Sequence, residues 1–177
     1  GINKIYDGDA IATVNLLNDS IASDDLADSY TTATFDTRNV GTGKTVSVSG
    51  ITISGTDAEN YTLTSTTAST TANITKKDLS ATGITASNRE YNSETNATLV
   101  YGSALLSGLI SGNEARLDET GTGIFAREHA ANGITVDITG LTVTGTDAGN
   151  YSFTPTASTT ANITKKVLTV IGITANN

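Results

Sequence analysis

The block Ile53-Ser-Gly-Thr-Asp-Ala-Glu-Asn-Tyr61 returns further along the chain as Val143-Thr-Gly-Thr-Asp-Ala-Gly-Asn-Tyr151. A second block, Ser69 to Lys77, returns without any change as Ser158 to Lys166. Self-similarity at a fixed spacing is typical of a structural unit that occurs more than once. The sequence therefore predicts two tandem copies of one module.

The second copy is longer than the first. The offset between matching residues grows from 85 at Tyr6 and Tyr91 to 90 at Phe35 and Phe125. The extra residues must therefore lie between Tyr91 and Phe125. We expect them in the loop around residues 111–123.

The boundaries of the modules depend on the stretches that follow each Ile-Thr-Lys-Lys. Residues 78–86 and 167–175 are the corresponding alternating stretches, and both end in Gly-Ile-Thr-Ala. If each stretch is the first strand of the next module, the modules are 1–77, which lacks its own first strand, and 78–166. Residues 167–177 are then the first strand of a following, truncated module. Because an unpaired strand invites pairing, we expect this strand to pack on module two or to complete module one of another molecule.

The hydrophobic pattern indicates β-strands. In residues 46–54 and 134–143 apolar and polar side chains alternate, and the apolar parity changes at Gly50 and at Gly140. A change of parity moves side chains to the other face, so each glycine predicts a bulge or a bend between sheets. Further strands are expected at 10–16, 31–36, 61–67, 70–76, 96–101, 121–126, 150–156 and 159–165.

The expected fold class is all-β, with two tandem small antiparallel β modules arranged end to end. Each module is predicted to be sandwich-like, immunoglobulin-like or β-grasp-like, with at most one short helix. The candidate helices are residues 103–110, extending toward Asp118, and residues 20–27.

The composition restricts the chemistry. The chain has 177 residues, a formal net charge of −8, one His and no Cys. The lack of Cys excludes disulfides and thiol chemistry. A nucleic-acid partner is not expected, because such proteins concentrate Lys and Arg. No apolar run is long enough for a membrane span, so membrane insertion is not expected.

The repeated Asp-Ala-x-Asn-Tyr block has the spacing of the tyrosine corner of immunoglobulin-like sandwiches. We expect Tyr61 and Tyr151 to be anchors of the fold, with hydroxyls bonded to nearby backbone. Asp57 and Asp147 are expected to cap the turns by accepting backbone N–H groups. A Ca²⁺ or ligand loop at this turn is the alternative.

Few residues could carry a reaction or hold an ion. His129 is the sole imidazole, and a catalytic base also needs a nucleophile and an orienting partner, so no catalytic residue, no cofactor and no enzymatic activity are expected. Asp24, Asp25 and Asp28 are weak candidates for Ca²⁺, which takes six to eight oxygen ligands. Solvated loop acids are the favoured interpretation.

Several separated blocks together resemble the YDG repeat domain. They are Tyr6-Asp7-Gly8, the stretch from Phe35 to Tyr61, and Ala72-Asn-Ile-Thr-Lys-Lys77. The second module departs from the family at Tyr91-Asn92-Ser93, where the family has Tyr-Asp-Gly. The resemblance implies tandem repeats in large bacterial surface or secreted proteins of the filamentous-haemagglutinin-like adhesin type. It places the chain outside the cell, at the bacterial surface.

The function implied by this resemblance is that of a spacer or stalk that extends a distal binding region. Its partners would be the neighbouring repeats of the same chain. The alternative is a module that binds a glycan or another host ligand, with exposed Tyr6, Tyr30 or Tyr101 as contacts. An elongated particle without binding would favour the spacer.

Overall fold

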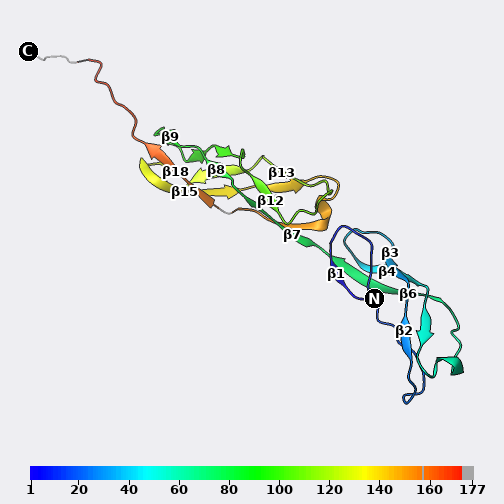
Figure 1. The fold of residues 1–177 in the computed structure, drawn as a ribbon. Helices are drawn as coiled ribbons and strands as arrows, with labels where there is room; N and C mark the ends of the chain where they lie inside the picture. Colours follow the sequence, from blue (N-terminus) through cyan, green and yellow to red (C-terminus); the bar gives the residue numbers. More distant parts are fainter. Residues whose placement is uncertain (157, 173–177) are drawn as a thin grey trace, which may run out of the picture. The chain divides into compact units, whose positions relative to one another are not determined.

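The computed structural model describes residues 1–156 and 158–172 (Figure 1). Almost all regular structure is β, which confirms the expected fold class. Residues 1–82 contain β1 (Lys4–Ile5), β2 (Ala27–Ser29), β3 (Thr32–Phe35), β4 (Gly41–Ser49), β5 (Thr52–Ser54), β6 (Thr67–Thr75) and β7 (Lys77–Thr82). Residues 85–164 contain β8 (Thr85–Ala86), β9 (Arg89–Glu90), β10 (Asn96–Ala97), β11 (Leu99–Val100), β12 (Leu105–Ser107), β13 (Arg116–Asp118), β14 (Thr122–Phe125), β15 (Ala131–Thr139), β16 (Thr142–Thr144), β17 (Tyr151–Thr154) and β18 (Ser158–Thr164).

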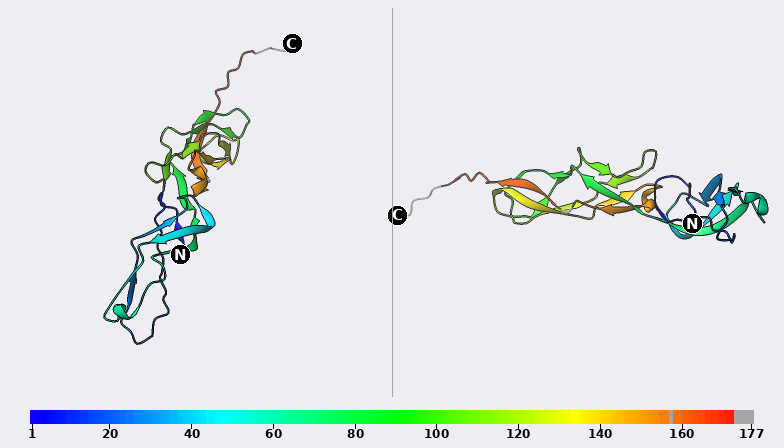
Figure 2. Two further views of the ribbon diagram at one scale, coloured as in Figure 1. Left: turned by 90° about the vertical axis from the view of Figure 1, so that its right-hand side faces the viewer. Right: turned by 60° about the horizontal axis from the view of Figure 1, so that its bottom comes forward.

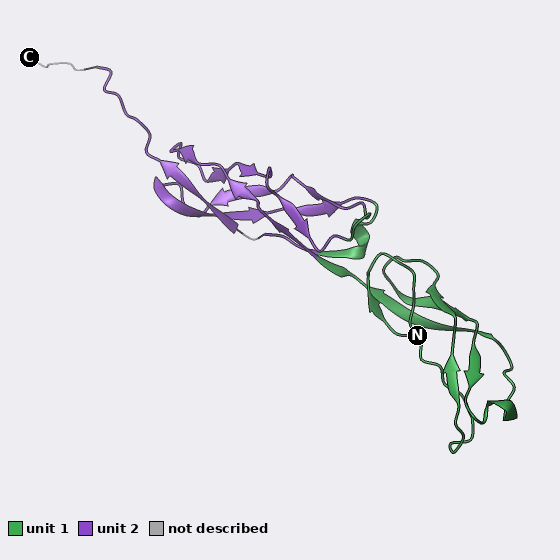
Figure 3. Cartoon of the chain, viewed as in Figure 1, with its two compact units in different colours: residues 1–78, 110–113, 146–152 green, residues 79–109, 114–145, 153–177 purple. Residues whose placement is uncertain are grey.

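The chain forms two compact units, coloured separately in Figure 3. Unit 1 consists of residues 1–78 together with two segments of the second repeat, 110–113 and 146–152. Unit 2 consists of residues 79–109, 114–145 and 153–177. The division at residue 78 places most of β7 in unit 2, although β7 follows β6 after a single residue.

A four-stranded sheet with the order β1-β6-β4-β3 organises unit 1. β4 runs antiparallel to β3 and β6, whereas β1 runs parallel to β6. Along β4 and β6 of this sheet, buried residues alternate with exposed threonines and serines, because successive side chains of a strand point to opposite faces and only one face is covered. The inward set includes Val46, Val48 and Ile74, which are 0%, 4% and 1% exposed. The burial of these β-branched side chains supplies the hydrophobic stabilisation of the sheet.

Unit 2 repeats this sheet as β10-β14-β15-β18-β9 and adds a smaller one, β12-β7-β17. Phe125, Val136 and Ile163 form a core cluster on the large sheet. A second cluster joins Ala81 and Ile84 to Ile138 of β15 and to Leu141 just after it. β7 therefore supplies side chains to the core of unit 2.

Gly50 and Gly140 lie where the long strands end. Their φ angles are +67° and +75°, a region that side chains with a Cβ rarely adopt. The chain leaves the large sheet at each glycine and continues as β5 or β16, which pairs in a separate two-stranded sheet with β2 or β13. Each glycine thus lies at the change of parity, between two sheets.

Two asparagines hold the irregular starts of the long strands. The register of β4 shifts between Gly41 and Lys44, where the Asn73 side-chain oxygen accepts the N–H of Gly43 at 2.8 Å. Asn162 accepts the N–H of Gly133 in the same way at 2.7 Å. The shared Ala-Asn-Ile-Thr block therefore contributes both core and turn contacts.

Both expected helices are wrong. Residues 103–110 contain β12, and residues 20–27 contain only turns and the start of β2. The helical pieces are the short 3-10 turns η1 (Ala58–Asn60) and η2 (Ala148–Asn150). The apolar pair in residues 105–106 is used for strand pairing with β7, and that tertiary contact outweighs local helix propensity. In the described residues there is no helix with the length and apolarity of a membrane span.

The extra residues of the second repeat also lie elsewhere than expected. The backbone N–H of Ile110 and that of Ile21 make the same hydrogen bond, each to the tyrosine of its own repeat, and these two positions already differ by 89. Most of the insertion therefore precedes Ile110 and does not lie in residues 111–123.

The segment after β18 is irregular over residues 165–172 (Figure 2). Its apolar side chains are largely exposed: Leu168 is 91% and Ile171 is 97% accessible. Residues 167–172 thus form no strand on module two, and residues 173–177 of this expected strand lie outside the described residues. Pairing with another molecule stays a prediction.

Candidate functional site

The tyrosine corner of the second repeat lies in unit 1. The Tyr151 hydroxyl accepts the backbone N–H of Ile110 at 3.1 Å, a bond of the kind that the corner predicts. The Asn113 amide donates to the hydroxyls of both Tyr151 and Tyr6 at 2.7 Å. The ring of Tyr151 meets that of Tyr6 edge to face, with centroids 5.5 Å apart. One amide thus joins two aromatic residues.

Tyr6 is therefore not an exposed ligand contact. It is 1% accessible, because the Tyr151 ring and Asn113 cover it. Gly8 lies close to Ile110, since a Cβ added at Gly8 would come 3.1 Å from a methyl group of that side chain. The Tyr-Asp-Gly block of the first repeat serves as a packing surface within unit 1.

Polar contacts surround this aromatic pair. The Arg38 guanidinium lies 2.9 Å from the carboxylate of Asp147, which is 6% exposed. The Asn150 side-chain oxygen accepts the N–H of Val40 at 2.9 Å, and its amide donates to Asn39 at 3.2 Å. A buried carboxylate and a buried amide are thus matched to partners across the contact. We call Asn113, Asp147, Asn150 and Tyr151 the docked corner.

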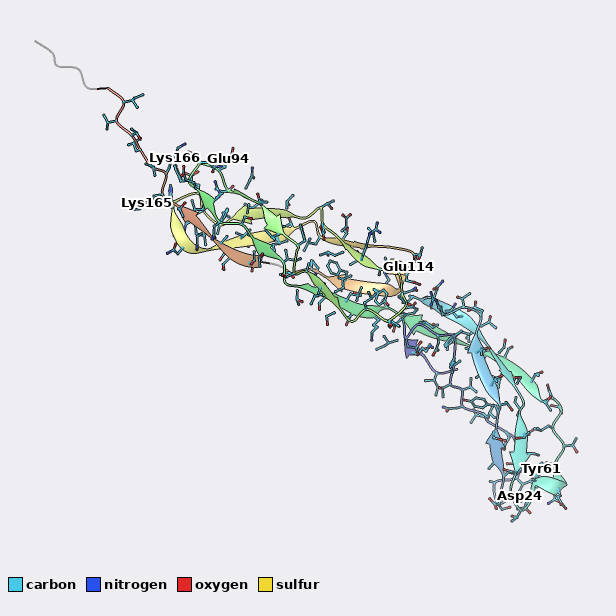
Figure 4. The ribbon with its side chains drawn as sticks, turned by 45° about the horizontal axis from the view of Figure 1, so that its top comes forward. Asp24, Tyr61, Glu94, Glu114, Lys165 and Lys166 are labelled. Carbon is cyan, nitrogen blue, oxygen red and sulfur yellow. The ribbon has the colours of Figure 1, made fainter. Side chains whose placement is uncertain are left out.

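The first repeat has the corresponding set Asp24, Asp57, Asn60 and Tyr61, which we call the open corner. The Tyr61 hydroxyl accepts the N–H of Ile21 at 3.0 Å and donates to Asp24 at 2.6 Å (Figure 4). The hydrogen bond to Asp24 raises the pKa of Tyr61. Tyr61 is nevertheless only half-buried and Asn60 is exposed, whereas their counterparts in the docked corner are 3% and 6% accessible.

The expected capping role of Asp57 and Asp147 is wrong. Neither carboxylate accepts a cap hydrogen bond within its own turn. The backbone closes the turn itself, because the N–H of Asn60 bonds the carbonyl of Asp57. The Asp57 carboxylate is then free to accept the N–H of Asp25 at 2.9 Å. It joins the turn to the neighbouring loop and does not stabilise the turn from within.

Gly55 and Gly145, which were not among the expected site residues, determine how closely that loop approaches. A Cβ at Gly55 would lie 2.1 Å from the carbonyl oxygen of Asp25, and one at Gly145 would lie 2.2 Å from that of Glu114. Both have φ angles above +120°. Both glycines open the repeated Gly-Thr-Asp-Ala block, and this recurrence is the sequence feature that could have identified them.

The three candidate calcium ligands are not brought together as one set. In the described residues there is no group of three or more His, Cys, Asp or Glu that could hold a metal ion. Each carboxylate has a different partner: Asp24 accepts from Tyr61, Asp25 from Thr56 and Asp28 from Asn18.

Two lysines hold acidic side chains near the large sheet of unit 1. The Lys4 ammonium contacts Asp7 at 2.7 Å and Asp9 at 2.8 Å, and Lys44 contacts Asp36 at 2.6 Å. Burial lowers the pKa of Lys4, but the hydrogen bonds to the two carboxylates outweigh it, so its pKa is raised. The Lys44 hydrogen bond holds the pKa of Asp36 below its usual range.

The remaining candidate residues, Tyr30, Tyr101 and His129, have other neighbours. The Tyr30 hydroxyl accepts the N–H of Val14 at 3.4 Å, and the Tyr101 hydroxyl donates to the carbonyl of Gly121 at 3.4 Å. Burial raises the pKa of Tyr101. His129 is exposed in a loop, 3.9 Å from Glu128.

Comparisons with known proteins agree with the prediction of two tandem copies of one module. A family described as the YDG domain matches residues 1–69 and again residues 75–161. No curated protein and no solved structure matches the chain.

Proposed function

The chain belongs to the YDG domain family, and we propose that it is a segment of structural spacer repeats in a large bacterial surface or secreted adhesin. In this role the repeats extend a distal binding region, outside the cell. The proposal assigns no catalytic residue and no cofactor.

The observation that carries the proposal is the docked corner. Asp147, Asn150 and Tyr151, which recur in both repeats, are occupied by contacts with residues of the first repeat inside unit 1. Recurring residues whose polar groups in one copy bond to the other copy can serve to assemble an array. In solenoids and other arrays, neighbour contacts of this kind make up part of the stability.

The composition supports the same role. Exposed Thr, Ser and Asn keep a repetitive surface soluble, and the aromatic content of 5% leaves few side chains for a hot spot. The net charge of −8 opposes lateral clumping of parallel copies, although salt screens it beyond about 8–10 Å.

A glycan array combined with small-angle X-ray scattering on this chain tests the proposal. A spacer retains no glycan and scatters as an elongated particle. Saturable glycan binding that is lost in Tyr30→Ala or Tyr101→Ala would contradict it and support the ligand-binding alternative. Tyr6→Ala is not a useful probe, because Tyr6 is buried.

A further inference from the structure

The surface that the docked corner contacts inside unit 1 differs between the repeats, although the Asp, Asn and Tyr of the corner motif are the same in both. That surface, which we call the receiving face, consists of Tyr6, Gly8, Arg38, Asn39 and Val40. The corresponding residues of the second repeat are Tyr91, Ser93, Glu128, His129 and Ala130. The tyrosine alone is shared. The corner motif is therefore constant, whereas the receiving face varies.

The loop that carries Arg38 has the same local structure in both repeats. β3 and β14 each end in a phenylalanine that pairs with a valine of the next strand. One residue later, the N–H of Asp36 donates to a carbonyl of β4 at 3.0 Å, and the N–H of Ala126 donates to a carbonyl of β15 at 2.9 Å. The Arg38 and Glu128 side chains are both 44% accessible. Glu128 thus takes the place of Arg38 in an equivalent loop.

The exchange of arginine for glutamate reverses the charge at the contact. The Arg38 guanidinium donates to the Asp147 carboxylate at 2.9 Å, and Asp147 is 6% exposed. Glutamate has no proton to donate at neutral pH, so the charge-assisted hydrogen bond would be lost. It would also bring a second negative charge to a buried carboxylate, whose charged form a like charge disfavours. A receiving face of the second type therefore opposes a corner that carries aspartate.

The exchange of glycine for serine acts in the same direction. Gly8 has a φ of +92°, and a Cβ built there would lie 3.1 Å from a methyl group of Ile110, closer than an ordinary van der Waals contact. Ile110 is the residue whose N–H bonds the Tyr151 hydroxyl. Ser93 has a φ of +66°, so the backbone of this turn accepts a side chain in the second repeat. The glycine of the first repeat is thus used for the approach of the corner and not only for the turn.

We propose that Gly8 and Arg38 determine which corner a repeat receives. A face with glycine and arginine accepts a corner with a buried aspartate, and a face with serine and glutamate rejects it. Specificity then comes from unfavourable contacts with the wrong partner as well as from favourable ones with the right partner. The two repeats are therefore not interchangeable as receivers. The proposal does not rest on the spacer role, because the contacts within unit 1 are the same whatever the array does.

Hydrogen exchange of two amides in the full chain tests the proposal. The Val40 N–H donates to the Asn150 side chain and reports docking, whereas the Phe35 N–H bonds the carbonyl of Ala10 at 2.8 Å and reports the fold of unit 1. Arg38→Glu is expected to accelerate exchange at Val40 by about tenfold or more, the usual effect of losing a hydrogen bond to a charged group. Exchange at Phe35 is expected to stay unchanged, and Gly8→Ser added to Arg38→Glu is expected to accelerate Val40 further.

Asp147→Asn in two backgrounds distinguishes selection by charge from a general structural role. In the wild type this substitution removes the charge that Arg38 pairs with, so exchange at Val40 is expected to become faster. In the Arg38→Glu background it removes the repulsion and supplies an amide that donates to the glutamate, so exchange at Val40 is expected to become slower. The effect of one substitution thus reverses its sign, which a residue that only supports the fold would not cause.

Glu128→Arg is the matched control, because it makes the reverse exchange in the equivalent loop. It is expected to leave the exchange of Val40 as in the wild type. Unchanged protection of Val40 in the variant with both Gly8→Ser and Arg38→Glu would overturn the proposal. So would an effect of Asp147→Asn in the same direction in both backgrounds. Equal acceleration at Phe35 and Val40 in Arg38→Glu would also count against it, because unit 1 itself would then be unfolding.

Discussion

The two tyrosine corners have the same sequence pattern but different environments. Tyr151 is 3% accessible and packs on Tyr6, whereas Tyr61 is half-buried with the same hydrogen bond to the backbone. Local sequence therefore specifies the turn and the hydroxyl contact, and the neighbouring repeat decides how far the tyrosine is desolvated. The same motif can thus have one local geometry in both repeats and yet contribute differently to the free energy of unfolding in each.

The largest expected difference is between the two tyrosines. Tyr151→Ala removes a buried ring, its edge-to-face contact and the partner of Asn113, so a loss of about 3–5 kcal/mol is expected. Tyr61→Ala is expected to cost about 1 kcal/mol, because its ring is half-buried. Urea denaturation of both variants measures the difference in the free energy of unfolding. Equal losses would mean that the neighbouring repeat contributes nothing.

The next effect concerns Gly145, which lies two residues before Asp147 in the sequence. Gly145→Ala forces a Cβ to within 2.2 Å of the carbonyl oxygen of Glu114 at a φ of +126°, and about 2–3 kcal/mol of destabilisation is expected. Gly149→Ala lies in the same block with no atom within 4 Å and is the matched control, expected within about 0.5 kcal/mol of the wild type. Thermal unfolding of the two variants separates the effect of the site from that of the substitution. A Gly145→Ala variant as stable as its control would refute the close approach.

A smaller effect is expected at the ion pair of the docked corner. Arg38→Ala removes a charge-assisted hydrogen bond to buried Asp147, and about 1–2 kcal/mol is expected because the guanidinium is itself 44% exposed. Arg127→Ala, in the matching loop of the second repeat, is expected to change the free energy of unfolding by less than about 0.5 kcal/mol. Denaturant unfolding of both variants is the measurement. Similar losses in the two would show that the charge acts generally and not through Asp147.

The smallest effect is on pH dependence. The folded-state pKa of Asp36 is depressed, first by the hydrogen bond from Lys44 and then by the N–H of Thr37. This carboxylate therefore contributes stability that is present above its unfolded pKa, about 4, and is lost as the pH falls through the lower folded-state value. Asp36→Asn is expected to reduce the loss of stability on acidification in a pH series of unfolding measurements. An unchanged pH profile would remove Lys44 from the list of stabilising partners.

Sequence alone predicts a large part of this fold. The repeat, the all-β class and the position of the bends follow from patterns in which every second side chain is apolar. The hydroxyl-to-backbone contact of the tyrosines also follows, because the Asp-Ala-x-Asn-Tyr spacing fixes a local turn.

The parts that sequence could not predict depend on long-range contacts. Residues 103–110 look helical by propensity, yet they pair with β7, which is distant in sequence. The burial of Tyr6 and the pairing of Arg38 with Asp147 join residues more than a hundred positions apart, and no local pattern encodes them. The capping role of Asp57 was wrong for a similar reason, since its carboxylate accepts the N–H of Asp25, which lies in another loop.

The most direct test of the docked corner is the hydrogen exchange of the Val40 amide. Its N–H donates to the Asn150 side-chain oxygen at 2.9 Å, so it is expected to be protected in the wild type and to lose that protection in Asn150→Ala. The Gly133 amide, which donates to Asn162 in unit 2, is expected to exchange equally slowly in both proteins. A Val40 amide that exchanges freely in the wild type, or equally in both proteins, would contradict the docking of the second repeat's corner on the first repeat.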